Sequence, residues 1–133
     1  MKPMNHYYLS LFLILGLCLS SFTKPLSRWE KLGERKVNYT VDRDEIQVGA
    51  RDGFFDALQI KVKRNGINIS KMAVYYGNGT MDELEVREVI RQGGESRVID
   101  LKGNNRIIDK VVFWYDSKNN GKARAVVELW GRH

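Results

Sequence analysis

The sequence is poor in the residues that carry most catalytic and metal chemistry. Its 133 residues include 1 Cys, 2 His and 2 Pro. The cysteine, Cys18, and one histidine, His6, lie near the start, and the other histidine is His133. Without a Cys–His pair or an internal histidine, the usual nucleophilic triads and zinc or copper sites lack their ligands. We therefore predict no catalytic residue, no metal site and no cofactor.

The first residues have the composition of an export signal. Lys2 precedes an apolar run, Leu9–Leu19, and small or polar side chains follow it. A basic start, a short apolar core and a small-residue exit are typical of a secretory signal peptide, and the run is shorter than the roughly 20 residues of a membrane span. We predict a cleaved signal peptide at residues 1–23 and an exported domain at residues 24–133, periplasmic or extracellular, without a membrane span.

Lipid attachment at Cys18 is the alternative fate of this segment. The preceding Leu15-Gly16-Leu17 places a large leucine where a lipobox takes a small residue, so we predict export without a lipid. The exported part then has no cysteine. Disulfides cannot stabilise it, and packing alone must hold its roughly 110 residues together.

The remaining sequence predicts β-strands separated by glycine- and asparagine-rich turns. Phe54–Lys63 alternates most clearly, because Leu58, Ile60 and Val62 are separated by polar residues, and a period of two is that of a half-buried strand. The other extended segments are Trp29–Val41, Glu45–Gly49, Ile67–Tyr76, Asp82–Ile90, Ser96–Leu101, Ile107–Tyr115 and Ala123–Leu129. About eight antiparallel strands predict one small all-β domain, a jelly-roll-like β-sandwich.

Four segments give more local predictions. Asn65-Gly66 favours a type I′ hairpin turn, and a switch in the alternation at Ser70-Lys71 indicates a bulge. The nearly continuous apolar run Ile107–Tyr115 predicts a central strand. Asp82–Ile90 contains enough glutamate for a short helix, but we assign it to a strand because strands surround it.

The charged residues do not predict nucleic-acid binding or a clear metal site. The net charge is +6, but the basic residues are scattered among acidic ones, without the basic stripe and stacking aromatics of nucleic-acid binders. A solvated surface explains them, and an anionic envelope polymer is the alternative partner.

Asp42–Glu45 concentrates three carboxylates, as calcium sites do. We expect a strand-connecting turn with solvated acids there, and the sequence does not decide the question.

Five residues are candidates for ligand binding: Arg97, Asp100, Arg106, Trp114 and Tyr75. The arginines could bind an anion or a sugar, and the aromatic rings could stack on a sugar, together with Trp29 and Trp130. Core packing is the common alternative for aromatic residues in small β domains. Arg97 and Asp100 have opposite parity along a strand, so they should not face each other. An Arg–Asp brace elsewhere across the sheet is the structural alternative.

Several short motifs extend over nearly the whole exported part. They are Leu32-Gly33-Glu34-Arg35, Asp42-Arg43-Asp44 with Ile46 and Val48, Val74-Tyr75-Tyr76 with Asn78-Gly79, Gly94 with Ser96-Arg97 and Ile99-Asp100-Leu101, and Arg106 with Ile108, Val111 and Phe113. On these residues, the stretch Trp29–Gly131 resembles the YaaI-like family of uncharacterised secreted bacterial proteins. The resemblance implies a signal peptide, a small β-sandwich and no assigned activity.

These features predict an exported, non-catalytic β-sandwich protein that binds a ligand or partner at the cell envelope. The expected partner is an envelope polymer, a glycan or a protein. The alternative is a small carboxylate-dependent hydrolase that acts on envelope glycans. Such an enzyme needs two acidic side chains within about 10 Å of each other in one cleft.

Overall fold

The computed structural model describes residues 28–38, 42–116 and 123–133, so the predicted signal peptide lies outside the described residues. Within these ranges, no helix is long and apolar enough to cross a membrane. The elements of the described residues are β1 Trp29–Lys36, β2 Arg43–Gln47, the 3-10 helix η1 Ala50–Asp52, β3 Phe54–Phe55, β4 Ala57–Lys63, β5 Ile67–Tyr76, β6 Met81–Ile90, β7 Ile99–Asp100, β8 Arg106–Tyr115 and β9 Val126–Arg132.

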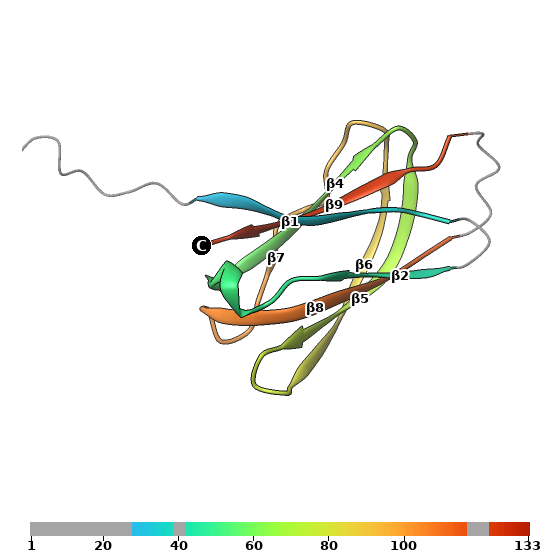
Figure 1. Ribbon diagram of the computed structural model, residues 1–133. Coiled ribbons are helices and arrows are strands. Elements are labelled where there is room, and N and C mark those ends of the chain that lie inside the picture. Colours follow the sequence, from blue (N-terminus) through green and yellow to red (C-terminus); the bar gives the residue numbers. More distant parts are fainter. Residues whose placement is uncertain (1–27, 39–41, 117–122) are drawn as a thin grey trace, which may run out of the picture.

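The strands form two antiparallel sheets that pack against each other. Sheet A has the order β1-β9-β4-β7, and sheet B has the order β2-β8-β5-β6, with β3 also paired to β8. In Figure 1, β1, β4 and β9 lie above β2, β5 and β8. Apart from β3, eight strands are divided between the sheets so that most sheet neighbours are distant in sequence, which is the arrangement of a jelly roll. The predicted all-β sandwich is therefore confirmed.

Alternate residues of both sheets make one apolar core between them. Sheet A contributes inward side chains such as Leu58, Ile60 and Leu129, and sheet B contributes Val111 and Phe113, each at most 2% exposed. Fully burying one such side chain stabilises the folded state by about 1.5–3 kcal/mol. Packing of this kind holds the sandwich together, since the described residues contain no cysteine.

The prediction of one continuous strand at Phe54–Lys63 is wrong, because the chain changes sheets at Asp56. Phe54 and Phe55 pair with β8 in sheet B, whereas Ala57–Lys63 pairs with β9 in sheet A. The crossing residue stays hydrogen-bonded, since the Asp56 N–H donates to the Arg132 carbonyl at 2.9 Å. Hydrophobic alternation reports which side faces the core and does not identify the neighbouring strand, so it conceals this change.

The predicted hairpin at Asn65-Gly66 is also wrong. β4 and β5 belong to different sheets, so this turn connects the two layers. A type I′ turn needs positive φ at both central residues, but positive φ occurs at Arg64 (72°) and at neither Asn65 nor Gly66. The Asn65 side chain instead holds the turn, because it donates to the Ala123 carbonyl at 2.8 Å and accepts from the Gly66 N–H.

Three other local predictions are confirmed. The register shifts between Ile69 and Lys71, which places a bulge at the predicted position. β8 is central, because it pairs with β2, β3 and β5. The glutamate-rich segment is a strand, β6, at the edge of sheet B.

Of the predicted strand Ser96–Leu101, only Ile99–Asp100 forms a strand, β7. Ser96 lies before this strand, and its side chain is buried. The Ser96 hydroxyl accepts a hydrogen bond from the Ile60 N–H at 2.9 Å and donates to the Arg97 carbonyl at 2.7 Å. This short segment closes one side of the sandwich between the two sheets.

Candidate functional site

The five predicted ligand-binding residues lie in separate parts of the molecule. Arg97 contacts the edge strand β6, and Asp100 contacts β9. Tyr75 and Trp114 lie on the outer face of sheet B, and Arg106 lines a hollow at one end of that sheet. Arg106 and Trp114 are eight residues apart on β8, which corresponds to about 26 Å along a strand. One small ligand cannot contact both.

Arg97 is a brace for the edge strand. Its guanidinium donates hydrogen bonds to the Glu85 carbonyl at 2.7 Å, to the Val86 carbonyl at 2.8 Å and to the Glu88 carboxylate at 3.1 Å. The β6 backbone is irregular at this point, since Arg87 has a φ of 48°. Arg97 therefore satisfies carbonyl groups of an edge strand and links β6 to the segment before β7.

Asp100 takes part in a second brace. The Arg132 guanidinium donates to the Asp56 carboxylate at 2.8 Å and lies 3.5 Å from the Asp100 carboxylate. The hydrogen bond with Asp56 raises the pKa of Arg132. Arg97 and Asp100 thus have different partners, although Arg97 precedes β7 and strand parity is not the cause.

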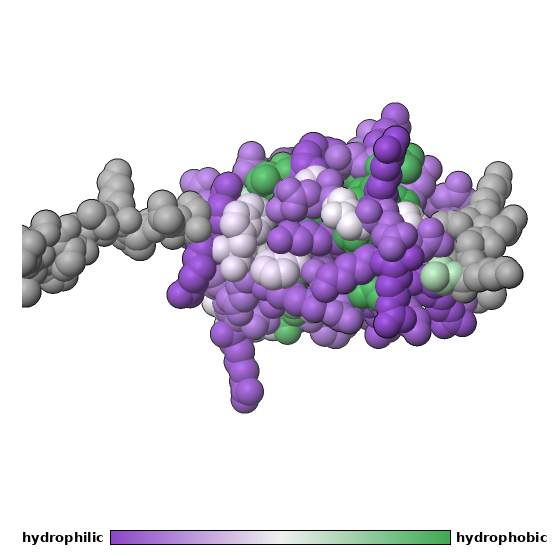
Figure 2. Space-filling view, turned by 90° about the horizontal axis from the view of Figure 1, so that it is seen from above, coloured by the Kyte–Doolittle hydropathy of each residue, from purple (hydrophilic) through white to green (hydrophobic). Residues whose placement is uncertain are grey.

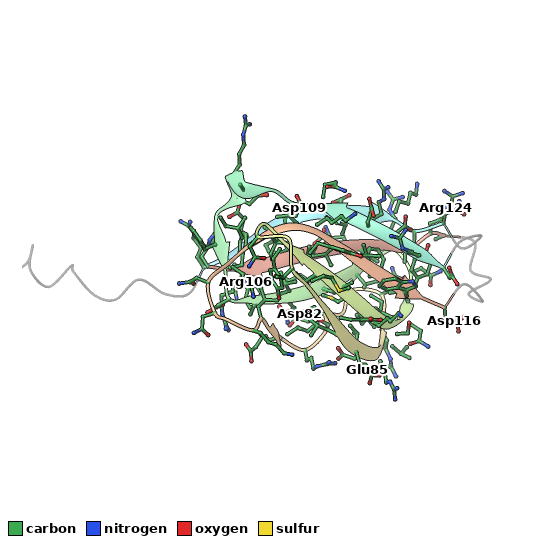
Figure 3. The ribbon with its side chains drawn as sticks, turned by 90° about the horizontal axis from the view of Figure 1, so that it is seen from below. Asp82, Glu85, Arg106, Asp109, Asp116 and Arg124 are labelled. Atoms are coloured by element: carbon green, nitrogen blue, oxygen red, sulfur yellow. The ribbon has the colours of Figure 1, made fainter. Side chains whose placement is uncertain are left out.

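The two predicted aromatic residues on sheet B have cations against their rings. The Lys71 Nζ atom lies 4.6 Å from the centre of the Trp114 ring, and the Lys110 Nζ atom lies 4.8 Å from that of Tyr75. Such cation–π contacts are favourable, and each cation occupies a ring face that a sugar would need. Figure 3 looks onto this side of the molecule and shows it crowded with charged side chains.

Trp29 and Trp130 lie on the outer face of sheet A. The Lys61 Nζ atom is 4.1 Å from the Trp130 ring centre, and the Arg132 Cζ atom is 5.6 Å from that of Trp29. Figure 2 looks onto this face and shows a mostly hydrophilic surface with small, separated hydrophobic spots. The four aromatic residues therefore do not share one platform, because they divide between the two outer faces.

Glu128 is a buried carboxylate on the outer side of sheet A. Its oxygens accept hydrogen bonds from Lys63 at 2.7 Å and from the Trp130 indole at 3.0 Å, and Lys31 lies 3.3 Å away. Burial alone would raise the pKa of Glu128, but these donors outweigh it and lower the pKa to about 2. The charge is neutralised within the protein, so Glu128 is structural.

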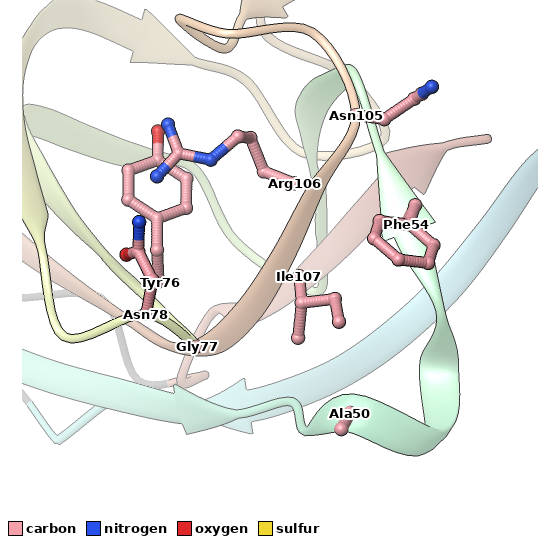
Figure 4. Close-up of a pocket in the computed structure, with 8 residues that line it drawn as sticks. All are labelled: Ala50, Phe54, Tyr76, Gly77, Asn78, Asn105, Arg106 and Ile107. Atoms are coloured by element: carbon pink, nitrogen blue, oxygen red, sulfur yellow. The ribbon is translucent and has the colours of Figure 1, made fainter.

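The hollow at Arg106 has a volume of about 410 Å³ and lies where three segments meet. It is bounded by the turn between β5 and β6, the start of β8 and the segment from η1 to β3 (Figure 4), and its lining residues are Ala50, Phe54, Tyr76, Gly77, Asn78, Asn105, Arg106 and Ile107. Its end of the molecule is opposite to Asp116, the residue after β8 (Figure 3).

Arg106 is held in place by neutral groups. Its guanidinium lies 3.6 Å from the centre of the Tyr76 ring, and it donates to the Lys102 carbonyl at 2.8 Å and to the Thr80 hydroxyl at 3.2 Å. Arg106 is half-buried, yet within the described residues it forms no ion pair. The side chain is therefore oriented while its charge is not neutralised.

Tyr76 supports this guanidinium from below. Its hydroxyl donates to the Asp82 carboxylate at 3.1 Å, and the residue is 4% exposed. Burial first, and this hydrogen bond second, raise the pKa of Tyr76 to about 12. Tyr76 thus stays neutral at ordinary pH and presents a fixed ring to Arg106.

Phe54 and Gly77 shape the apolar part of the hollow. Phe54 is 56% exposed, whereas its neighbour Phe55 is fully buried, because successive strand residues face opposite sides. A Cβ atom at Gly77 would lie 2.9 Å from the Ile107 Cγ2 atom, so only glycine permits this close packing. The hollow thus has an apolar floor and a polar rim.

Sequence reasoning found Arg106 and missed its neighbours. Phe54, Tyr76, Asn78 and Asn105 each follow an ordinary strand or turn pattern, and no pattern marks them as one site. The Asn78-Gly79 pair, which is typical of a turn, was the nearest signal in the sequence. In the structure the Asn78 side chain is held in place, because its Oδ1 atom accepts a hydrogen bond from the Thr80 hydroxyl at 2.6 Å.

The acidic segment Asp42–Glu45 does not form a converging set of carboxylates. Asp44 accepts a hydrogen bond from the Tyr115 hydroxyl at 2.9 Å, whereas Glu45 lies 3.9 Å from Lys110. The two belong to opposite faces of β2, since adjacent strand residues alternate. Throughout the described residues, no group of three or more His, Cys, Asp or Glu side chains could hold a metal ion.

Two carboxylates do share one surface hollow on sheet B. Glu83 and Glu85 line it together with Lys71 and Arg87. Glu83 is 2.7 Å from Lys71, Glu85 is 3.1 Å from Arg87, and their side chains are 52% and 72% exposed. Each acid has a cationic partner and contact with solvent, so the desolvation that tunes a catalytic acid is absent from this pair.

Comparison with solved structures finds two distant likenesses. AlgX of Pseudomonas aeruginosa is 13% identical, with a TM-score of 0.47 over 78% of this chain and 26% of AlgX, so the chain spans about a quarter of that protein. A mutant of a carbohydrate binding module of family 29 is 15% identical, with a TM-score of 0.34 over 80% of each chain. At these TM-scores neither likeness carries an argument about function.

Sequence comparison gives the family. No curated protein matches the chain. A family model described as a domain of unknown function, DUF2541, matches residues 8–131. This agrees with the resemblance to a family without an assigned activity. Because the match extends over nearly the whole sequence, the protein belongs to the DUF2541 family.

Proposed function

We propose that this protein is an exported, non-catalytic domain that binds a saccharide of the cell envelope in the hollow at Arg106. One observation carries the proposal: an oriented guanidinium without an ion pair among the described residues and an exposed aromatic ring, Phe54, line the same hollow. A concave, mostly apolar surface with a small number of placed polar groups is the usual mark of a binding site.

The lining of the hollow matches the chemistry of a sugar. The Phe54 ring offers an apolar face to the C–H groups of a pyranose. Asn78 and Arg106 supply amide and guanidinium groups that can donate to ring hydroxyls. The volume of about 410 Å³ is within the range of about 300–1,000 Å³ typical of small-ligand pockets.

Export is supported by the composition of residues 1–23. The family match begins at residue 8, inside this segment, so the apolar leader is part of the family pattern. A fusion of residues 1–30 to an enzyme that is active only outside the cytoplasm tests it. We expect activity from the fusion and none when Leu9–Leu19 is deleted. Equal activity from both fusions would contradict export through this segment.

A glycan array tests saccharide binding. We expect the protein to retain at least one neutral or acidic saccharide, and Phe54→Ala to weaken that binding about tenfold or more, since it removes the stacking face. Val89→Ala is the matched control, because it truncates another exposed apolar side chain (74% exposed) near the opposite end of sheet B. No retained saccharide, or equal binding by Phe54→Ala, would refute the proposal.

The hydrolase alternative is tested on the same material. After prolonged incubation with each retained saccharide, we expect no new reducing ends. If reducing ends form and Glu83→Gln or Glu85→Gln abolishes them, the protein is an enzyme and the non-catalytic proposal is wrong.

A further inference from the structure

We infer that the saccharide bound in the hollow is acidic, and that its carboxylate binds the Arg106 guanidinium. This inference rests on the proposed saccharide-binding function and names the chemical class of the ligand. The observation behind it is that the Arg106 guanidinium has no counter-ion among the described residues.

The described arginines divide according to burial and pairing. Two are half-buried, Arg106 and Arg132, and Arg132 is neutralised by Asp56 and Asp100. Exposed arginines need no counter-ion, because water solvates them. Arg106 alone among the described arginines is both half-buried and without a carboxylate partner. Partial burial of an unpaired charge is unfavourable, and an anionic ligand would offset that cost.

The remaining donors of Arg106 are already positioned for a carboxylate. A guanidinium carries five N–H donors in a rigid fork. Two hydrogen bonds, to Lys102 and Thr80, and the Tyr76 ring fix its plane. The other donors find no acceptor among the described residues. Since the fork is held before the ligand arrives, little rotational freedom is lost on binding.

The charge of the hollow selects an anion with a single charge. Arg106 is the only charged side chain among the lining residues. Asp82 does not line the hollow, and its carboxylate accepts the hydrogen bond of Tyr76. One guanidinium neutralises one carboxylate but not a doubly charged phosphate monoester. The apolar floor at Phe54 and Ile107 further favours an anion attached to a sugar ring over a free inorganic ion.

Matched pairs of uronic acid oligosaccharides and their methyl esters test this inference, because the two members of a pair differ only in the charge and in one small methyl group. We expect at least one acid form to bind about tenfold more tightly than its ester at low salt, and the difference to shrink at high salt. Equal binding of acid and ester, or retention of neutral saccharides alone, would overturn the inference and leave saccharide binding intact. If no saccharide binds, both fail. Effective competition by inorganic phosphate would also overturn the carboxylate assignment.

Variants assign the preference to Arg106. Arg106→Gln keeps a hydrogen-bonding side chain without the charge, so it should lose the preference for the acid and still bind the ester. Arg106→Lys keeps the charge without the fork, so it should retain part of the preference. Arg87→Gln is the control, because it removes an exposed arginine from a pair on β6. If Arg106→Gln, checked for an unchanged thermal unfolding curve, prefers the acid as the wild type does, the inference is wrong.

Discussion

Arg97 and Arg106 carry the same side chain in nearly opposite surroundings. The Arg97 guanidinium donates to two backbone carbonyls and a carboxylate, all on the edge strand β6. The Arg106 guanidinium donates to a carbonyl and a hydroxyl and stacks on a tyrosine ring, with its charge unmatched among the described residues. The difference separates a structural arginine from one that is available to a ligand.

Glu128 shows that the same distinction holds for an anion. It is buried on an outer face, but two lysines and an indole satisfy its oxygens. Position on a surface or in a hollow is therefore a poor guide to function by itself. What matters is whether the partners of a charge are supplied by the fold.

The largest effect on stability is expected from Arg97→Ala. The substitution leaves the Glu85 and Val86 carbonyls and the Glu88 carboxylate without this donor, so the free energy of unfolding should fall by about 2–3 kcal/mol. Urea unfolding measures it. Arg87→Ala, which removes an exposed ion pair 3.1 Å long, should cost less than about 0.5 kcal/mol. Equal losses in the two variants would refute the structural role of Arg97.

Glu128→Gln is expected to cost about 2 kcal/mol near neutral pH, because it removes a buried charge from its donors. The folded-state pKa of Glu128, about 2, lies below its ordinary value of 4.5. Its contribution is thus fully present above about 4.5 and is lost as the pH falls toward 2. The unfolding free energies of wild type and variant should converge over that interval. A constant difference between them would show that Glu128 does not titrate in this way.

Tyr76→Phe should cost about 1 kcal/mol, because it removes one hydrogen bond to Asp82 and keeps the ring beneath Arg106. The pKa of Tyr76 is raised from 10.0 to about 12, so its contribution is complete below about pH 10 and is lost as the pH rises through about 12. The alkaline absorbance titration of the variant should lack one late-titrating tyrosine. Saccharide binding should change little, and a large loss would show that the hydroxyl itself contacts the ligand.

Phe54→Ala should have the smallest effect on stability, within about 0.5 kcal/mol, since most of the ring is exposed. Binding, by contrast, should fall. Thermal unfolding and glycan binding should be measured on the same sample of each variant. Arg97→Ala should lose stability and keep glycan binding, which is the reverse of the result expected for Phe54→Ala. If Phe54→Ala destabilises the fold substantially, the ring serves packing at the start of β3 and the hollow loses its proposed stacking face.

Local sequence patterns predicted the strands because their cause is local. Alternation at Leu58, Ile60 and Val62 requires one buried side in any sheet. The parity expected for Arg97 and Asp100 did not apply, because Arg97 precedes β7 and lies outside the strand. The change of sheet at Asp56 escaped prediction because the identity of a neighbouring strand depends on residues far along the chain, here Arg132.

The candidate site could be predicted only in part. Arg106 was one of the five predicted candidates, but Tyr75, Trp114 and Asp100 lie elsewhere with partners of their own. Phe54, Tyr76 and Asn105 come from three segments with more than 20 residues between neighbours in sequence. Regular spacing in the sequence cannot connect these three segments, because they come together only through strand pairing and the change of sheet at Asp56.

Composition, short motifs and short-range periodicity were enough to establish the class of fold, the scarcity of nucleophiles and metal ligands, and the family. Which charges are neutralised and which are not became visible only in the folded protein. An arginine has the same chemistry at positions 97, 106 and 132, and its role depends on the acceptors that distant strands place within about 3 Å of its nitrogen atoms.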